Sequence, residues 1–469
     1  LGDVYKRQVC MFTTDTIAAI STGTMGSGGI GIIRISGDEA IEVADRLFRG
    51  VSGKKLADCA SHTIHYGTIV KDDKVLDEVL VSVMKAPNTY TREDVAEINC
   101  HGGILVTRKI LDAVIDAGAR PAEPGEFTKR AFLNGRIDLT QAESVIDIIN
   151  SQNEYALSSS VMQLRGKLSE EITRIREIIL DNTAFIEAAL DDPEHYALDG
   201  YGDKLAEDVD KCVDKLDSLL KTSDNGRILK DGIRTVILGK TNAGKSSLLN
   251  ALAGEDRAIV TDIAGTTRDT LEESISLDGV ILNLTDTAGI RDTEDIVEKI
   301  GIEKAMKCAG NADLIIYVAD ATRNLDDNDK KILDFVKGRH VIVLLNKTDV
   351  ENVLSVEQMR EHTDFPVLAI SAREQTGIRE LSDTIRQMFF AGQISSNDQI
   401  YITNARHKNM LKESINSLKL VKESIENGMP EDCYTIDLLN AYESLGKIIG
   451  QAVEDDLVNQ IFSKFCMGK

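Results

Sequence analysis

A short glycine-containing segment constrains the fold of this chain more than any other feature. The residues from Gly239 to Ser246, GKTNAGKS, follow the apolar run Thr235 to Leu238 and precede a helical pattern. A strand, a glycine loop and a helix in this order form a phosphate cradle, because backbone N–H groups and the helix N-terminus then face the phosphates. We expect Lys245 to reach the β- and γ-phosphates and Ser246 to ligate Mg²⁺. The segment therefore predicts a nucleoside-triphosphate site in an α/β domain.

The base of the nucleotide is specified further along the chain. The segment Asn346 to Asp349, NKTD, ends an apolar strand pattern. The Asp349 carboxylate can accept hydrogen bonds from both the N1–H and the exocyclic amine of guanine, a pair of donors that adenine lacks. Ser371 and Ala372 follow the next apolar run and are expected to direct a backbone N–H to the guanine O6. These two segments predict guanine specificity.

Two more segments carry the chemistry of the γ-phosphate. The segment Asp286 to Gly289, DTAG, stands where another strand pattern ends, so that Asp286 would hold the Mg²⁺ shell and the Gly289 N–H would sense the γ-phosphate. Thr267, within the segment Gly265 to Asp269, would supply a second Mg²⁺ hydroxyl. Together the segments predict a Ras-like G domain that hydrolyses GTP. The residues predicted to bind GTP are Asn242, Ala243, Gly244, Lys245, Ser246, Ser247, Thr261, Asp262, Ile263, Ala264, Gly265, Thr266, Thr267, Asp286, Thr287, Ala288, Gly289, Asn346, Lys347, Asp349, Ser371 and Ala372.

The pattern of apolar residues changes along the chain. Short β-branched runs broken by Gly and Pro extend to about Asn134 and indicate an α+β domain. From about Leu139 apolar residues recur every three or four positions, for example from Val161 to Ile179, as in a helical bundle, and this periodicity resumes from Asn404, where it includes Leu439. Between these helical parts, apolar runs alternate with helical patterns, as in a mostly parallel sheet. We predict an α/β Ras-like G domain inserted into an all-α helical domain, preceded by an α+β N-terminal domain.

The predicted domain limits follow from these changes. The stretch Asp3 to Gln8 resembles translated sequencing-adaptor sequence, so we interpret residues 1–10 as an artefactual leader and Met11 as the start. The predicted segments are the N-terminal domain at 11–134, the first helical part at 135–232, the G domain at 233–392 and the second helical part at 393–469.

Composition argues against several classes of protein. Apolar runs such as Leu314 to Ala319 fall far short of the roughly 18 residues that cross a bilayer. The seven cysteines are scattered without a C-x-x-C pair, which is typical of a reducing compartment and predicts a cytoplasmic location. The formal net charge of −23 argues against a protein that grips RNA mainly by its phosphates. Any nucleic-acid contact is therefore expected to be local or provided by a partner.

Two patterns have more ordinary explanations than the sites they resemble. The segment Gly26 to Gly31 fits G-x-G-x-x-G, but the following residues alternate like a strand and do not open a helix, which disfavours a dinucleotide fold. Cys59, His62 and His65 have metal-like spacing. Strand alternation would send the two histidines to opposite faces, and no fourth ligand is near in sequence. We expect neither a dinucleotide nor a metal at these positions.

The combination of these motifs resembles one family, the tRNA modification GTPases called MnmE or TrmE. The resemblance covers Asp15 to Lys469. Beside the G-domain segments it rests on blocks of the N-terminal part and on the last residues of the chain: Gly28 to Gly37, Thr91 to Glu97, His101 to Gly103, Arg120 to Thr128, Arg130 to Leu139, and Phe465 to Lys469. A G domain flanked by helices is common among GTPases, whereas this N-terminal block together with a Cys-x-Gly-Lys terminus is specific.

The resemblance implies a particular chemistry. Members of the family form homodimers through the N-terminal domain and bind 5-formyl- or 5,10-methylene-tetrahydrofolate there. With the FAD-containing flavoprotein MnmG, in a heterotetramer, they add a carboxymethylaminomethyl or aminomethyl group to C5 of the wobble uridine of certain tRNAs. By motif position, the folate contacts of the family match Arg34, Glu97, Arg136 and Lys469, and its essential terminal cysteine matches Cys466. Cations suit the folate carboxylates, and Glu97 suits the N–H groups of the pterin ring.

Some positions depart from the family pattern. Many relatives have Lys where Arg136 stands, which keeps the charge, and Asp192 replaces the apolar residue usual before the proline of the helical loop. Without the resemblance, simpler interpretations would be favoured for the other positions. Arg34 would then be a solvated strand residue, Glu97 a surface acid and Cys466 a small apolar filler at a chain end.

The mechanism of hydrolysis must differ from that of Ras-type enzymes. Ile290 follows the DTAG segment, so the usual water-orienting Gln is missing. The resemblance implies that Glu298 is catalytic and acts on the attacking water through a second water. It also implies that a K⁺ ion replaces an arginine finger and that hydrolysis is coupled to G-domain dimerisation. The implied K⁺ ligands are Asn242 and the backbone carbonyls of Thr261, Ile263 and Thr266.

Two other functions remain open from the sequence. The first is a regulatory GTPase switch, of the kind that acts in ribosome assembly, whose flanking domains only bind partners. A basic RNA-binding module would favour it, and none is recognisable in the sequence. The second is a self-sufficient one-carbon transferase, but no segment resembles a flavin or nicotinamide site for the redox step. A flavoprotein partner is therefore expected.

Overall fold

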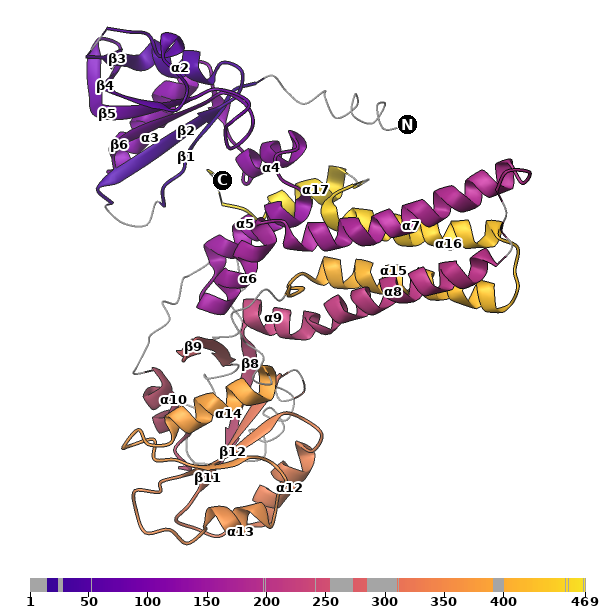
Figure 1. Cartoon of the computed structure of the whole chain (residues 1–469). Helices are drawn as coiled ribbons and strands as arrows, with labels where there is room; N and C mark the ends of the chain where they lie inside the picture. The colour runs from indigo at the N-terminus through magenta and orange to yellow at the C-terminus, as the bar shows by residue number, and fades with distance from the viewer. Residues whose placement is uncertain are drawn as a thin grey trace. The chain divides into compact units, whose positions relative to one another are not determined.

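Figure 1 shows the computed structural model of the chain, which describes residues 15–23, 28–51, 53–196, 198, 200–240, 242–253, 273–284, 310, 312–390, 400–451, 453, 455–466 and 468. The chain divides into two compact units. Of the described residues, the first unit holds those within Leu1–Ile146, Gln163–Thr183 and Leu439–Lys469. The second holds those within Asp147–Met162 and Ala184–Leu438. The first unit contains an N-terminal sheet, and the second contains a sheet that includes the strand before the phosphate loop.

The N-terminal sheet has seven strands in the order β3-β4-β5-β6-β2-β1-β7. Its pairs are antiparallel except for β1 with β7, which run parallel. The strands are β1 (Ile17–Ile20), β2 (Ile30–Ser36), β3 (Phe48–Gly50), β4 (Thr63–Lys71), β5 (Lys74–Met84), β6 (Val95–His101) and β7 (Arg120–Pro121). The segment after the G-x-G-x-x-G pattern is thus a strand, β2, as its alternation predicts.

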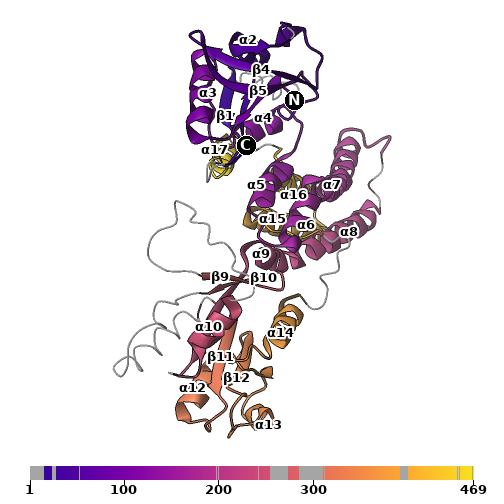
Figure 2. The ribbon, with the colours of Figure 1, turned by 90° about the vertical axis from the view of Figure 1, so that its left-hand side faces the viewer.

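The two faces of this sheet differ in their covering. Successive side chains of a strand point to opposite faces, so Ile33 and Ile35 share one face and Arg34 lies on the other. Helices α2 (Ala40–Leu47) and α3 (Ile104–Asp116) pack on the face of Ile33 and Ile35 and bury it (Figure 2). On the opposite face, α4 (Glu126–Leu133) covers the end near β1, where Phe127 packs against Ile17. The rest of this face carries polar and exposed apolar side chains.

Helical segments precede and follow the second sheet. They are α5 (Leu139–Asn150), α6 (Glu154–Leu164), α7 (Lys167–Asp191), α8 (Tyr201–Lys221), α9 (Ser223–Asp231), α15 (Ala405–Glu426), α16 (Asp432–Ile449) and α17 (Asp455–Phe462). In the second unit α8 and α15 pack against each other, although about 200 residues separate them in sequence, and Lys422 of α15 pairs with Asp210 of α8 at 2.7 Å. In the first unit Arg176 of α7 stacks on Tyr442 of α16. In each unit, a helix that precedes the second sheet in sequence thus packs against a helix that follows it.

The second sheet has six strands in the order β13-β12-β11-β8-β10-β9. They are β8 (Ile233–Gly239), β9 (Glu273–Leu277), β10 (Val280–Leu284), β11 (Leu314–Asp320), β12 (Val341–Asn346) and β13 (Val367–Ala369). All pairs are parallel except β9 with β10. The mostly parallel sheet agrees with the sequence prediction, whereas β9 is an additional strand. Its pattern of ESISL and a tight turn at Asp278 and Gly279 make it the antiparallel partner of β10.

Helices cover both faces of the second sheet. The helices α10 (Lys245–Ala253) and α14 (Ile378–Phe390) pack on one face, against Ile316 and Leu344. The helix α12 (Asp327–Phe335) and the short α13 (Val356–Arg360) pack on the other, against Tyr317 and Val343. The central strands are apolar on both sides for this reason. In the described part of the chain no helix is long and apolar enough to cross a membrane.

The helical periodicity in the sequence does not map onto one uninterrupted element. The apolar series that continues from Val161 to Ile179 crosses a break between α6 and α7, where Gly166 has a positive φ of 83°. Within α7 the series is buried, since Leu168 and Ile172 are 0% exposed. The series in α16 is only partly buried, because Leu439 is 40% exposed. The fold as a whole is an α/β G domain inserted into a helical region and preceded by an α+β domain, as predicted.

Candidate functional site

The phosphate loop connects the C-terminal end of β8 to the N-terminus of α10. Gly239 has φ of 149°, and a Cβ atom there would lie 2.4 Å from the carbonyl oxygen of Val318. Gly244 has φ of 95°, and a Cβ there would lie 2.1 Å from Nδ2 of Asn346. Both positions therefore require glycine, because a side chain would collide with a neighbouring loop or strand. The predicted glycines thus allow two other segments to approach the phosphate loop.

Lys245 begins α10 and folds back over the loop. Its Nζ donates hydrogen bonds to the carbonyl oxygens of Gly239 and Lys240, each at 2.6 Å. Burial lowers the pKa of Lys245, with a further contribution from the positive charge of Arg323. An ammonium has three N–H donors, so one remains for a phosphate oxygen. The next residue, Ser246, is exposed at the start of the helix and offers a hydroxyl oxygen, the ligand type that Mg²⁺ prefers.

The guanine segment is tied to the phosphate loop by one amide side chain. Asn346, which is 2% exposed, donates from Nδ2 to the carbonyl oxygen of Ala243 at 2.8 Å. Its Oδ1 accepts a hydrogen bond from the backbone N–H of Ala372 at 3.1 Å. Three of the predicted GTP segments, far apart in sequence, therefore meet at Asn346.

The other residues of the guanine segment also have defined partners. Asp349 is exposed, and its Oδ1 accepts a hydrogen bond from the Ser371 hydroxyl at 2.7 Å, which lowers the pKa of this carboxyl. The second oxygen of Asp349 is thus available to an outside donor. Lys347 has a positive φ of 71° and pairs with Asp320 at 2.7 Å. Sequence reasoning missed Asp320, although its place at the end of an apolar strand is a typical signal for a polar residue at such a site.

Several predicted site residues lie outside the described residues, so the structure says nothing about their surroundings. They are Thr261, Asp262, Ile263, Ala264, Gly265, Thr266, Thr267, Asp286, Thr287, Ala288, Gly289, Glu298 and Lys469. The predicted Mg²⁺ pair is therefore described only at Ser246. Of the predicted K⁺ ligands only Asn242 is described, with a positive φ of 61° in an exposed position of the phosphate loop.

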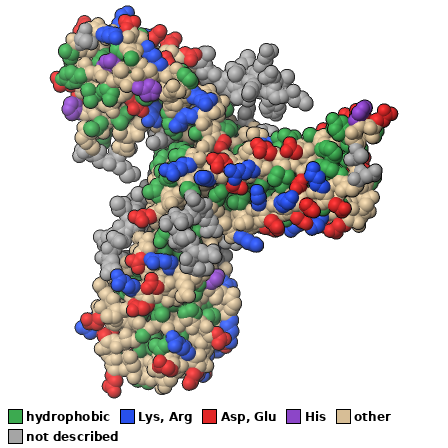
Figure 3. All heavy atoms as spheres, in the orientation of Figure 1, with side chains coloured by type: hydrophobic (Ala, Val, Ile, Leu, Met, Phe, Trp, Pro, Cys, Tyr) green, Lys and Arg blue, Asp and Glu red, His purple; other side chains and the backbone are tan. Residues whose placement is uncertain are grey.

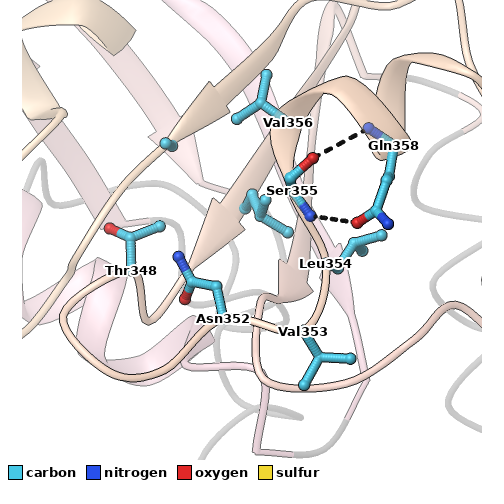
Figure 4. A pocket seen from close by; sticks show the side chains of 9 residues that line it. Thr348, Asn352, Val353, Leu354, Ser355, Val356 and Gln358 are labelled. Carbon is cyan, nitrogen blue, oxygen red and sulfur yellow. Dashed lines mark hydrogen bonds between the residues drawn. The ribbon is translucent and has the colours of Figure 1, made fainter.

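A cavity of about 440 Å³ lies beside the guanine segment (Figure 4). Thr348 and Asn352 line one side, and the first residues of α13 line another. Ser355 and Gln358 are locked there by reciprocal hydrogen bonds of 2.8 and 3.2 Å, which cap the helix. Neither Asn346 nor Asp349 lines this cavity. It is therefore a separate hollow and not the predicted guanine site.

A second cluster lies on the open face of the N-terminal sheet. Arg34 of β2 and Glu97 of β6 are direct cross-strand partners, and the Arg34 Nε donates to Glu97 at 2.7 Å. Their side chains are 17% and 22% exposed, so the pair is held at the surface of the sheet and is largely shielded from water. The structure thus brings together two residues that the sequence relates only through the family resemblance.

Aromatic side chains complete this cluster. The Arg34 guanidinium lies 5.3 Å from the ring centre of Tyr90 and 5.7 Å from that of Phe127. The guanidinium of Arg136, an exposed residue, lies 4.7 Å from the same Tyr90 ring. The Tyr90 hydroxyl lies 2.9 Å from that of Thr128, which fixes the ring against α4. Sequence reasoning missed Tyr90, because a single aromatic residue in a loop carries no periodic signal.

The C-terminal residues pack against the same domain. Phe465 is 5% exposed and packs on Phe462 at 5.2 Å between ring centres. The backbone N–H of Gly125 donates to the carbonyl oxygen of Cys466 at 3.4 Å, and the Ser21 hydroxyl donates to that of Gly468 at 3.1 Å. Cys466 itself is exposed. The terminal motif therefore lies against β1 and the start of α4, on the sheet that carries Arg34.

The other metal-like pattern does not form a ligand set. Cys59 Sγ lies 3.9 Å from Nδ1 of His65, while His62 contacts Ser61 and the carbonyl oxygen of Asn88. Within the described residues no three His, Cys, Asp or Glu side chains are arranged to hold a metal ion. The two histidines thus have separate partners.

Two family models match the chain. The model for the MnmE helical domain matches residues 139–466, and the model for the N-terminus of the GTP-binding protein TrmE matches residues 16–136. Among curated proteins, the tRNA modification GTPase MnmE of Lachnoclostridium phytofermentans is 59% identical over 97% of this chain and 100% of its own. The protein of the same name from Acetivibrio thermocellus is 49% identical over 98% of this chain and 100% of its own.

A solved structure is similar over about a third of the chain. The G domain of the T. maritima FeoB iron transporter is 27% identical and covers 33% of this chain and 97% of its own, with a TM-score of 0.26. That score adds no weight to the assignment, which rests on the family models and the curated relatives. The chain belongs to the MnmE family and is a tRNA modification GTPase.

Proposed function

We propose that this GTPase acts with an FAD-containing MnmG partner to add a (carboxymethyl)aminomethyl group to C5 of the wobble uridine, with a tetrahydrofolate as one-carbon donor. One observation carries the folate part of the proposal: Arg34, Glu97, Tyr90 and Arg136 meet on the open face of the N-terminal sheet. The C-terminal motif with Cys466 packs on the same sheet. Charged groups, an aromatic ring and a thiol are thus gathered in one domain.

The cluster suits a folate in its chemistry. Arg136 is exposed and carries no carboxylate partner among the described residues, so its guanidinium is available to a carboxylate of the folate glutamate tail. Glu97 is an acceptor for the N–H groups of a pterin, and Arg34 holds it in place. Lys469, which lies outside the described residues, would add a further cation. When bound, the folate would supply the one-carbon unit, and the exposed Cys466 thiol would act in its transfer.

For GTP hydrolysis, we assign roles to the predicted residues by their position. Lys245 would hold the β- and γ-phosphates, with Mg²⁺ on Ser246 and Thr267. Asp349 would read guanine, and the Ala372 N–H, which here donates to Asn346 Oδ1, would turn to the guanine O6 when the base binds. Glu298 would orient the attacking water, and a K⁺ ion on Asn242 and the carbonyls of Thr261, Ile263 and Thr266 would supply the charge of an arginine finger. The side-chain oxygen of Asn242 is the kind of ligand that such an ion accepts.

The same open face supports a homodimer. Ile30, Ile64, Tyr66 and Leu80 are 67%, 65%, 55% and 47% exposed. Cross-strand pairing of Tyr66 with Leu80 and of Ile64 with Ser82 puts them on one surface. An uncovered apolar sheet face is typical of a self-complementary twofold interface. We therefore propose that two copies pair through their N-terminal domains, beside the folate site.

Contact with tRNA is proposed to be mainly through the partner. The face in Figure 3 shows Lys and Arg side chains interspersed with Asp and Glu over the long helices, with no continuous basic area. The net charge of −23 agrees with this distribution. We propose a cytoplasmic location, where tRNA and the partner flavoprotein are available.

The folate assignment is tested by calorimetry on the full chain with 5-formyl-tetrahydrofolate. The proposal requires saturable binding that is lost when Arg136 is replaced by Ala and is retained by Arg136→Lys. Absence of binding by the unmodified protein would defeat the folate assignment, while the GTPase activity would stand.

A further inference from the structure

The side chain of Lys240, the second residue of the phosphate loop, reaches the N-terminal end of α12. Its Nζ lies 2.9 Å from Asp329 Oδ2 and also contacts Asp326. The Lys240 side chain is only 9% exposed and that of Asp329 is 6% exposed. Asp326 is the N-cap of α12 and Asp329 lies in its first turn, so the buried Lys240–Asp329 pair joins a loop to a helix that is distant in sequence.

The Asp329 carboxylate, which accepts from Lys240, is held in place by other hydrogen bonds. Asp329 Oδ1 accepts the hydroxyl hydrogen of Tyr317, a fully buried residue of β11, and its Oδ2 accepts the Asp326 N–H at 2.9 Å. Asp326 in turn accepts the N–H groups of Asn328 and Asp329, so the two acids form the capping box of α12. The Asp329 carboxylate cannot follow a moving lysine without breaking these bonds. It is a fixed point to which the loop is attached.

The backbone of Lys240 connects this anchor to the phosphate site. Its carbonyl oxygen accepts one of the hydrogen bonds from Lys245 Nζ at 2.6 Å, and the Gly239 carbonyl accepts the other. Lys245 is partly buried, and these two carbonyls hold two of the three N–H groups of its ammonium. The direction of its remaining N–H therefore depends on where the Lys240 carbonyl lies.

We propose that Lys240 is a positioning residue for GTP hydrolysis, which anchors the start of the phosphate loop to α12 and thereby orients Lys245 toward the β- and γ-phosphates. In this role the Lys240 ammonium stays on Asp326 and Asp329, and only Lys245 contacts the phosphates. Its effect is confined to ligands that Lys245 contacts. GDP and GTP carry a β-phosphate, whereas GMP does not. Loss of the orientation of Lys245 should therefore weaken GDP binding and not GMP binding, whereas general damage to the nucleotide site should weaken both.

The test uses the full chain with Lys240→Met, which keeps an unbranched side chain one atom shorter and removes its charge. We expect GDP affinity and kcat to fall about tenfold each, the size of one lost charge-assisted contact, while GMP affinity changes less than about twofold. Lys240→Arg should restore most of the loss, because it keeps the donors. Competition against a fluorescent GDP analogue gives the affinities, and phosphate release gives kcat.

The matched control is Lys337→Met. Lys337 pairs with Asp334 at 2.7 Å just after α12, and both side chains are largely exposed. It should change neither affinity nor kcat. If Lys240→Met does not fold, Asp326→Asn and Tyr317→Phe loosen the same anchor and should give a smaller loss for GDP without a loss for GMP. Equal losses for GDP and GMP, or a lower unfolding temperature with unchanged affinity and kcat, would overturn the proposal.

Discussion

The nucleotide loops and the N-terminal cluster are assembled from the chain in different ways. In the G domain, short contiguous segments supply the groups of the site, and Asn346 joins three of these segments. In the N-terminal domain, single side chains from β2, β6, a loop and the segment after α4 converge, with Arg34 facing Glu97 across two strands. A site built from contiguous segments leaves a readable motif, whereas a site built from scattered side chains leaves almost none.

The difference has consequences for how each site tolerates change. The phosphate loop depends on glycine at positions such as Gly244, where a Cβ would collide with Asn346. The N-terminal cluster depends on the identity of individual charged and aromatic residues. Substitutions in one region should therefore leave the reaction of the other intact, unless the two are chemically coupled.

The largest expected effect would show that the two regions can be separated. Cys466→Ser should abolish wobble-uridine modification, because the exposed thiol is lost, while GTP hydrolysis continues at the normal rate. Mass spectrometry of tRNA nucleosides from cells carrying only the variant measures wobble-uridine modification, and phosphate release measures GTP hydrolysis. Cys433→Ser, on α16, is the control and should preserve both. Normal modification by Cys466→Ser would remove the thiol from the proposal.

The next effect concerns the cation in the G domain. Hydrolysis should be faster in K⁺ than in Na⁺ at equal ionic strength, by on the order of 10³, the lower end of what an arginine finger contributes. Asn242→Ala should remove the difference. Because Asn242 has a positive φ, Asn242→Gly serves as the strain-free control and should remove it as well. Glu298→Ala should slow turnover and leave GTP binding in place. Equal rates of the unmodified protein in the two salts would contradict the K⁺ assignment.

The base specificity of the nucleotide site should change when one carboxylate oxygen of Asp349 is replaced by an amide nitrogen. Asp349→Asn should weaken GTP binding by about 100-fold, since the donors of guanine lose their acceptor, and should improve binding of xanthosine triphosphate. Equilibrium titration with both nucleotides measures the reversal. Glu351→Gln, two residues further on and exposed, should bind GTP normally. A protein that hydrolysed ATP as readily as GTP would be inconsistent with this assignment.

The smallest expected effect concerns folate affinity in the N-terminal domain. Arg34→Ala should reduce the affinity for 5-formyl-tetrahydrofolate by at least about tenfold, or ~1.4 kcal/mol, because Glu97 loses the partner that orients it. GTP hydrolysis should be largely unchanged. Lys71→Ala, which breaks an exposed ion pair with Asp116 on the same domain, is the control for folate calorimetry. A parallel fall in GTPase rate would show that the two regions are coupled more tightly than their construction suggests.

Much of the architecture could be predicted from periodicity and motifs. The insertion of an α/β domain into a helical region and the strand after the false dinucleotide motif are both present as expected. The prediction missed β9, because a five-residue strand beside a tight turn has too few residues for a clear period. It also treated Leu439 as part of an apolar helix face, although the residue is 40% exposed. Periodicity shows that a helix has an apolar face and does not show which part of that face is covered.

The sequence by itself determined the segments whose chemistry is local. A phosphate loop needs a glycine pattern next to a lysine and a serine, and a guanine segment needs an aspartate beside a strand end, so both can be read along the chain. Arg34, Glu97, Arg136 and Cys466 were reached only through resemblance to a family. Their residue types occur on any protein surface and carry no spacing rule.

The tertiary structure decided which distant side chains meet. It paired Arg34 with Glu97, brought two guanidinium groups to the Tyr90 ring, joined Lys347 to Asp320, and anchored Lys240 on Asp329. Each of these contacts joins residues that are at least 25 positions apart and depends on strand register or on how a helix packs on a sheet. Strand register and helix packing depend on the whole core. When one face of a sheet is buried, the register that buries it also decides which side chains lie together on the other face.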